Sequence, residues 1–251
     1  MPGKIPALIG LLVCGHAWAA EVHVAVASNF SAPMKAIAAQ FESDTGHKVL
    51  LSSGATGKFY AQIRNGAPFE LLLAADDEVP ARLEAESLGV AGSRFTYAIG
   101  RLVLWSARPD LIDSRGEILK KAAFEHLSIA NPRLAPYGAA AVEVMKALDV
   151  FAVVEGKLVI GENIAQTYQF VHAGNAALGF VAMSQVYEDG KLKSGSAWTV
   201  PSHLHQPIRQ DAVLLKKGKD NPAALELARF LKDHKARSTI RRYGYEVQGG
   251  S

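Results

Sequence analysis

Apolar runs and amphipathic segments alternate along the chain, and small polar residues lie at many of the points where one gives way to the other. Residues 22–27 form the first apolar run, which stops at Ser28 and Asn29, and a helical spacing of apolar residues begins with Pro33 and Met34. A short apolar run is typical of a buried strand, and a spacing of three to four is typical of a helix. The alternation therefore predicts an α/β fold with largely parallel strands.

The same pattern predicts the later elements. Further strands are expected at 49–53, 70–75, 101–107, 126–130, 158–162, 178–183 and 208–215. Further helices are expected at 58–65, 79–88, 117–124, 138–150 and 166–172, and a final helix begins at Asn221 and Pro222, with Asn221 as its N-cap.

Two segments are suited to carrying the chain between lobes, namely the strand-rich stretch 94–105 and the proline-rich stretch 201–207. We therefore expect residues 20–98 plus 208–251 to form lobe one and residues 99–207 to form lobe two. A hinge is expected near Tyr97–Gly100 and His205–Ile208, where the chain would cross and the lobes would close on a ligand.

The first 19 residues differ in kind from the rest. Lys4 supplies a positive charge, residues 5–13 are apolar, and Ala17-Trp18-Ala19 is a small-x-small cleavage pattern. Together these features predict a secretory signal peptide at residues 1–19. The alternatives are a buried first strand and a lipoprotein signal, and the second is disfavoured because Val13, which precedes Cys14, is not small.

Composition excludes several classes of function. Cys14 is the only cysteine among 251 residues, so a mature chain without it has no disulfide, thiolate metal site or cysteine nucleophile. The formal net charge is only +3, and the basic residues are too scattered for a nucleic-acid surface. His203 and His205 have no third metal ligand nearby, residues 54–59 lack P-loop spacing, and no G-x-S-x-G motif occurs. We expect neither an enzyme nor a metal site.

Four predicted strand-to-helix junctions share small residues with hydroxyl or amide groups and have no charged residue at their centre. They are Ser28-Asn29, residues 53–57, residues 135–138 and residues 163–166. Each could be an ordinary helix cap, polar turn or packed aromatic residue. Taken together they indicate an anion site, because ligands of α/β sheets bind beside helix N-termini, whose free N–H groups attract negative charge.

The chain resembles the periplasmic molybdate-binding proteins of ABC transporters, a group of type II solute-binding proteins. The resemblance lies in residues 27–30 (ASNF), 45–47 (TGH), 52–54 (SSG), 60–63 (YAQI), 65–68 (NGAP), 75–76 (AD), 92–100 (GSRFTYAIG), 102–106 (LVLWS), 131–132 (NP), 135–138 (APYG), 178–182 (LGFVA) and 243–245 (YGY). These segments follow in order along nearly the whole mature chain. The resemblance implies a two-lobe type II periplasmic binding protein fold with a hinge between the lobes.

The resemblance also implies a site and partners. Ser28, Asn29 and Thr56 would hold the oxyanion from lobe one, and backbone N–H groups at Tyr137 and Ala165 would hold it from lobe two. One branch of the family has a tyrosine hydroxyl where this chain has an alanine at position 182, so Tyr137 could contribute its hydroxyl, its N–H or both.

The implied function is a monomeric periplasmic receptor that delivers molybdate, and tungstate, to an ABC permease and its ATPase, without a cofactor. A receptor for sulfate or phosphate is the alternative. An effector-sensing module of a regulator is disfavoured, because a signal peptide is predicted and no helix-turn-helix segment lies upstream.

Overall fold

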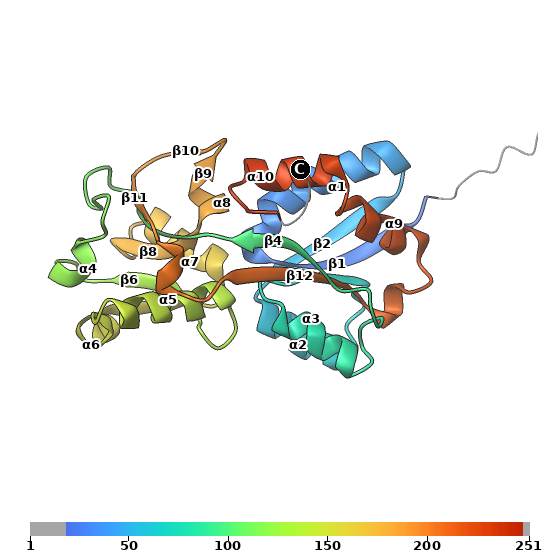
Figure 1. Ribbon diagram of the computed structural model, residues 1–251, viewed down its shortest axis with the longest axis horizontal. Coiled ribbons are helices and arrows are strands. Elements are labelled where there is room, and N and C mark those ends of the chain that lie inside the picture. The colour runs from blue at the N-terminus through green and yellow to red at the C-terminus, as the bar shows by residue number, and fades with distance from the viewer. Residues whose placement is uncertain (1–18, 248–251) are drawn as a thin grey trace, which may run out of the picture.

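The computed structural model describes residues 19–247, which form two α/β lobes side by side (Figure 1). The predicted signal peptide, apart from Ala19, lies outside the described residues, as does Cys14. Within the described part of the chain, no helix combines the length and apolar character needed to cross a membrane. The two-lobe α/β fold predicted from the alternating pattern is confirmed.

Lobe one contains a five-stranded sheet in the order β2-β1-β3-β12-β4. Its strands are β1 (Glu21–Ala27), β2 (Lys48–Gly54), β3 (Leu71–Leu73), β4 (Phe95–Gly100) and β12 (Ile208–Leu214). Its helices are η1 (Ser28–Phe30), α1 (Ser31–Thr45), α2 (Thr56–Arg64), α3 (Glu78–Ala85), η4 (Lys216–Gly218), α9 (Pro222–Phe230) and α10 (His234–Arg242). Strands β1, β2 and β3 are parallel, so the polar residues that follow them gather at one edge.

Lobe two contains a second five-stranded sheet in the order β11-β5-β8-β6-β7. Its strands are β5 (Leu102–Ser106), β6 (Leu127–Ala130), β7 (Leu158–Gly161), β8 (Leu178–Ala182) and β11 (Ser196–Thr199). A small hairpin pairs β9 (Tyr187–Glu188) with β10 (Lys191–Leu192). The helices of lobe two are α4 (Ile118–Lys121), α5 (Pro136–Ala147), α6 (Phe151–Val154), η2 (Glu155–Lys157), α7 (Ile164–His172), α8 (Met183–Val186) and η3 (Ser202–Leu204).

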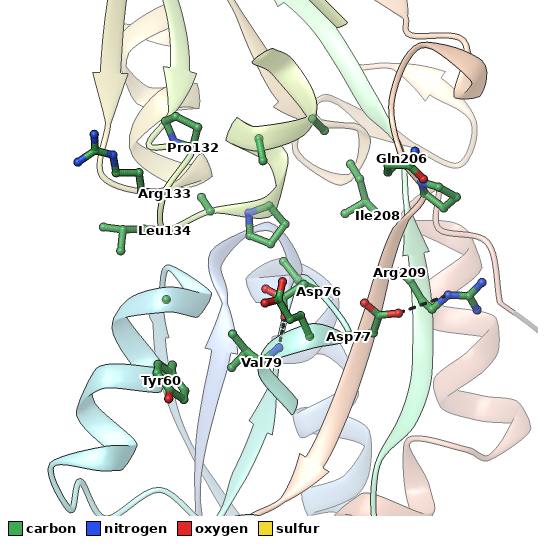
Figure 2. A pocket seen from close by; sticks show the side chains of 18 of the residues that line it. Tyr60, Asp76, Asp77, Val79, Pro132, Arg133, Leu134, Gln206, Ile208 and Arg209 are labelled. Carbon is green, nitrogen blue, oxygen red and sulfur yellow. Dashed lines mark hydrogen bonds and ion pairs between the residues drawn. The ribbon is translucent and has the colours of Figure 1, made fainter. Parts of the chain in front are cut away.

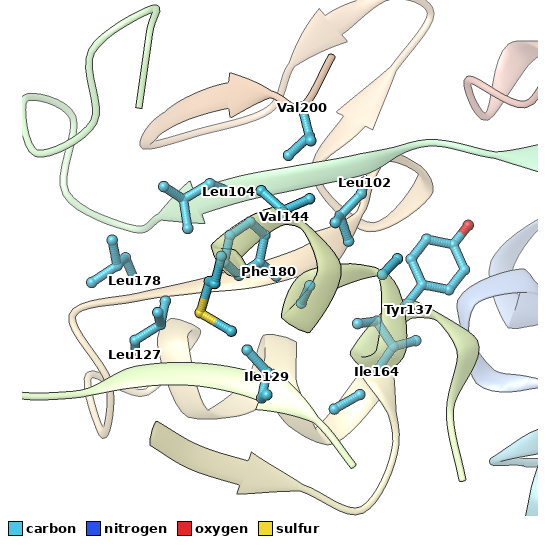
Figure 3. Close-up of a cluster of buried hydrophobic side chains, with 14 of the residues drawn as sticks. Leu102, Leu104, Leu127, Ile129, Tyr137, Val144, Ile164, Leu178, Phe180 and Val200 are labelled. Carbon is cyan, nitrogen blue, oxygen red and sulfur yellow. The ribbon is translucent and has the colours of Figure 1, made fainter. Parts of the chain in front are cut away.

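Each lobe has its own hydrophobic core, because most of its strands are apolar and are covered by helices. In lobe one, Val24 and Val26 of β1 are fully buried and pack with Phe30 and Met34. In lobe two, the core lies between the sheet and α5, and Tyr137 is at its edge with its hydroxyl directed away from the apolar side chains (Figure 3). The start of α5, where Tyr137 lies, is therefore supported by a well-packed core.

The chain crosses between lobes on two adjacent strands. Strand β4 ends at Gly100 and β5 begins at Leu102 in the other sheet, while β12 begins at Ile208 and returns the chain to lobe one. The two crossing strands pair with each other, Ile208 with Gly100 and Gln210 with Ala98. The predicted boundary after residue 98 falls within β4. Hinge motion and the division at 98 and 208 remain predictions.

Strand direction and several helix limits differ from the sequence-based expectation. Strand β5 is antiparallel to β8 and β11, and β12 is antiparallel to β3 and β4, so both sheets are mixed rather than parallel. The expected helix at 117–124 is shorter, because Ala122 adopts a left-handed conformation that ends α4. The final helix is divided into α9 and α10 by Asp233, whose backbone is extended. Strand β11 and the β9–β10 hairpin were not predicted.

Candidate functional site

Four of the predicted site residues, Ser28, Asn29, Thr56 and Tyr137, line one small cavity between the lobes. The complete lining is Ala27, Ser28, Asn29, Gly54, Ala55, Thr56, Ala75, Ala135, Pro136, Tyr137, Asn163 and Ile164. The cavity contains about 200 Å³ of atom-free space. This volume is below that of typical pockets for drug-sized ligands, so the cavity is suited to a small solute.

Three of the four helices that begin at this cavity have no side-chain cap. Ala27, Ala55 and Ala135 occupy the N-cap positions of η1, α2 and α5, and none of them has a side-chain acceptor for the first N–H groups. By contrast, Asn221 caps α9, which begins away from the cavity. Since the first N–H groups of a helix lack intrahelical partners, the alanines leave donors available to a ligand and also leave space for it.

Two hydroxyl groups can donate into the cavity. The Oγ1 atom of Thr56 accepts a hydrogen bond from the N–H of Ala75 at 3.0 Å, which leaves the hydroxyl hydrogen free to donate elsewhere. Ser28 is buried, and within residues 19–247 its hydroxyl has no hydrogen-bond partner. Each hydroxyl therefore has a hydrogen to donate to an acceptor bound in the cavity.

The side-chain amide of Asn29 is already committed to protein partners. Its Nδ2 atom donates to Oε1 of Gln210 at 2.8 Å and to the hydroxyl of Tyr245 at 3.0 Å. Both amide hydrogens are therefore used within the protein. Asn29 lines the cavity, and the donor it retains for a ligand is its backbone N–H. The sequence placed Asn29 at the site but did not show which of its groups is free.

Tyr137 has a similar division of roles. Its hydroxyl is buried and accepts a hydrogen bond from Nε2 of Gln210 at 3.0 Å. Burial is also the main reason that the pKa of this phenol is raised well above its usual value, so the group is neutral. Tyr137 is the second residue of α5, whose N-cap supplies no side-chain acceptor. Its hydroxyl is also hydrogen-bonded to that of Tyr245, so the group that it can offer a ligand is the backbone N–H.

Ala165, the fifth predicted site residue, does not line the cavity; its neighbours Asn163 and Ile164 do. The Oδ1 atom of Asn163 caps α7 by accepting from the N–H groups of Ala165 at 3.0 Å and Gln166 at 3.1 Å. This junction therefore lies where the sequence predicts it, although Asn163 already occupies the N–H of Ala165. A direct contact between Ala165 and a ligand remains a prediction.

A wider groove adjoins the cavity and is charged, unlike the cavity. Figure 2 shows Asp76 and Tyr60 on one side and Pro132, Arg133 and Leu134 on the other. Its lining also includes Asp77, Glu78, Arg82, Glu143 and Arg209. Burial raises the pKa of Asp76 to about 6. Because the carboxylates of this groove would repel an anion, the uncharged cavity is the better candidate site. Residues 19–247 contain no cluster of side chains that could hold a metal ion.

Sequence reasoning missed the buried polar residues behind the site. Gln210 lies within strand β12 and is fully buried, and Tyr245 and Ser184 are buried beside Asn29. The sequence does carry a signal for Gln210, because Arg209, Gln210 and Asp211 form a polar run within a predicted strand. The three N-cap alanines could also have been predicted from the sequence, since each comes directly before a polar or turn-forming residue.

Two mixed α/β lobes that enclose a small, uncharged cavity between helix N-termini define a solute-binding protein of type II architecture. The chain belongs to the bacterial extracellular solute-binding protein family, whose model matches residues 22–246. The molybdate-binding protein ModA of Azotobacter vinelandii is 64% identical over 239 residues, which are 95% of this chain and 94% of that protein. The protein of the same name from Rhodobacter capsulatus is 52% identical and covers 92% and 90% of the two chains.

Solved structures agree with this assignment. The periplasmic molybdate-binding protein of Azotobacter vinelandii superposes with a TM-score of 0.88 at 37% identity, over 91% of this chain and 100% of that one. The sulfate-binding protein SubI of Mycobacterium tuberculosis superposes with a TM-score of 0.72 at 12% identity, over 91% of this chain and 87% of that one. The second likeness shows the shared fold alone, so it does not favour sulfate as a ligand.

Proposed function

We propose that this protein is a periplasmic receptor that captures molybdate for an ABC importer. The observation that carries the proposal is an uncharged cavity lined by hydroxyl groups and uncapped helix N-termini, in a chain whose close relatives are named molybdate-binding proteins. The helix termini and hydroxyls supply partial positive charge and donors, so a dianion is held without a buried lysine or arginine. The empty site is then spared an uncompensated cation.

Each lobe contributes part of the shell in this proposal. Ser28 and Thr56 donate hydroxyl and backbone hydrogens, and Asn29 donates its backbone N–H. From lobe two, Tyr137 donates its backbone N–H, and the start of α7 at Ala165 completes the shell. A shell of fixed radius selects by size, because sulfate is smaller than molybdate and would leave some donors unpaired, whereas tungstate is nearly the same size and is accepted.

Closure of the lobes completes the site. Contacts beside the cavity already join the lobes, since the N–H of Gly57 donates to the carbonyl of Leu134 at 3.0 Å and Lys58 forms an ion pair with Glu162 at 2.7 Å. We assign the hinge to Tyr97–Gly100 and His205–Ile208, where the paired strands cross. The closed monomer is then the form that the permease recognises, and the ATPase drives transport. The receptor itself catalyses no reaction.

The test is a thermal unfolding series with molybdate, tungstate, sulfate and phosphate, followed by calorimetric titration. A ligand that binds only the folded state stabilises it by about 4 kcal/mol at a thousandfold excess over Kd. Molybdate and tungstate should raise the unfolding temperature strongly, and sulfate and phosphate much less. Equal shifts from sulfate and molybdate would refute molybdate selectivity and leave a general oxyanion receptor.

A further inference from the structure

A series of hydrogen-bonded, buried polar side chains joins a cavity-lining residue of lobe one to a cavity-lining residue of lobe two. Its members are Asn29, Gln210 and Tyr137, whose exposed fractions are 3%, 0% and 1%. Nδ2 of Asn29 donates to Oε1 of Gln210 at 2.8 Å, and Nε2 of Gln210 donates to the hydroxyl of Tyr137 at 3.0 Å. The second of these bonds crosses from lobe one to lobe two, so the Gln210 amide connects the two halves of the site.

The orientation of the Gln210 amide is determined by its partners. Oε1 accepts from Asn29 and also from the hydroxyl of Tyr97 at 2.9 Å, so two donors face the carbonyl oxygen. Turning the amide over would place its NH2 group against the Asn29 NH2 group. A glutamine meets all three partners at once, because it has an acceptor at one position and donors at the other.

This connection lies where the chain crosses between the lobes. A Cβ atom on Gly100 would lie 2.1 Å from the Tyr137 hydroxyl and 2.5 Å from Nε2 of Gln210, so the bonded pair occupies the space directly against the last residue of β4. Gln210 itself lies on β12, in register with Ala98 of β4. The hydrogen bond therefore spans the crossing strands and does not lie at the outer rim of the cleft.

We propose that Gln210 is a positioning residue that couples anion capture to lobe closure. By holding the Asn29 and Tyr137 side chains, it fixes the distance between the backbone N–H groups that these residues present from opposite lobes. This inference rests on the proposed function, because it needs an anion that both lobes contact. Loss of the link destabilises the closed complex, so the anion leaves faster, while association changes little.

Two phenylalanine substitutions separate coupling from general support of the buried amide. Tyr137→Phe removes the hydroxyl that bonds Gln210 across the lobes. Tyr97→Phe removes a hydroxyl that bonds the same amide from within lobe one. We expect Tyr137→Phe to speed anion release about five- to tenfold, which is the usual effect of losing one hydrogen bond, and Tyr97→Phe to change release less than about twofold.

The measurement is release of radiolabelled molybdate into excess unlabelled molybdate, with apo stability recorded by urea unfolding. A merely structural role of Gln210 predicts that both variants alter release in proportion to their losses of stability, and that result would overturn the inference. Gln210→Met provides the second test. If Tyr137 acts through Gln210, adding Tyr137→Phe to that background should change release little. A full further effect means that the hydroxyl acts through another contact, either the anion or Tyr245, and refutes the link.

The wild-type titration keeps the two proposals distinguishable. If the wild type binds sulfate or phosphate in preference to molybdate, the proposed ligand is wrong, and the same variants are compared with the anion that does bind. If the wild type binds none of the four anions, the proposed function fails and the coupling role fails with it. If it binds and the two phenylalanine variants release the anion equally, only the coupling role fails.

Discussion

Thr56 offers the sharpest test of the cavity as an anion site, because its hydroxyl has two separable roles. Oγ1 accepts a hydrogen bond from the N–H of Ala75 at 3.0 Å, and its hydrogen is free for the ligand. The residue is 1% exposed, so water cannot replace either partner. Thr56→Val keeps the shape of the side chain and deletes the hydroxyl, whereas Thr56→Ser keeps the hydroxyl and deletes a methyl group.

The expected magnitudes follow from these contacts. A hydrogen bond to a charged group contributes about 1.5–3 kcal/mol, so Thr56→Val should raise the Kd for molybdate about ten- to a hundredfold. The same change leaves the N–H of Ala75 unpaired and should lower the free energy of unfolding of the apo protein by about 1–3 kcal/mol. Thr56→Ser should keep most of the affinity and lose about 1 kcal/mol of stability with the methyl group.

Calorimetric titration measures the affinity, and urea unfolding of the ligand-free protein measures the stability. The two readouts should separate in the serine variant, because it loses stability but keeps its affinity. A valine variant that is destabilised yet binds molybdate as the wild type does would show that Thr56 only supports the loop at Ala75. In that case Thr56 would have to be removed from the site.

Three further changes test other features. Asp76→Asn keeps the acceptor for the N–H of Val79. Burial raises the pKa of Asp76 from 3.8 to about 6. Protonation of Asp76 therefore stabilises the folded state fully below pH 3.8, and this contribution is lost as the pH rises through 6. Urea unfolding should therefore show a gain of about 1–3 kcal/mol at pH 8 and little at pH 4; equal gains would contradict the assignment. Lys58→Met removes the exposed ion pair with Glu162, so labelled-anion release should rise less than about threefold at low salt and not at all at high salt; a salt-independent effect would indicate another cause. Gly100→Ala should speed release and lower the unfolding temperature because its Cβ meets the Tyr137 hydroxyl at 2.1 Å, whereas Gly156→Ala, with nothing within 4 Å, should do neither.

The convergence of the polar junctions could be predicted because it depends on local pattern and parallel strands. Ser28 and Thr56 follow β1 and β2, which are parallel neighbours, so their junctions meet at one edge of the sheet. The same holds in lobe two for the junctions after β6 and β7. A short apolar run does not encode its direction, however, and the antiparallel placement of β5 and β12 was therefore beyond periodicity alone.

The role of each polar group could not be predicted, because it is decided by partners far along the chain. The Asn29 amide is bound by Gln210 and Tyr245, which lie 181 and 216 positions away in sequence. The Tyr137 hydroxyl is bound by Gln210, 73 positions away. Residue type and local spacing identify both side chains as possible donors, but only the tertiary contacts show that these donors are used within the protein and that the backbone N–H groups remain.

The N-cap alanines explain why stability and binding compete at this site. A serine, threonine or asparagine at a helix N-cap typically contributes about 1 kcal/mol over alanine, and α9 uses such a cap at Asn221. Helices α2 and α5 instead begin after Ala55 and Ala135, so the N–H groups of Thr56 and Tyr137 lack that partner in the ligand-free protein. An anion bound in the cavity supplies it. The binding energy thus comes partly from relieving uncapped helix ends, which is why donors held by the backbone can bind a dianion without any cationic side chain.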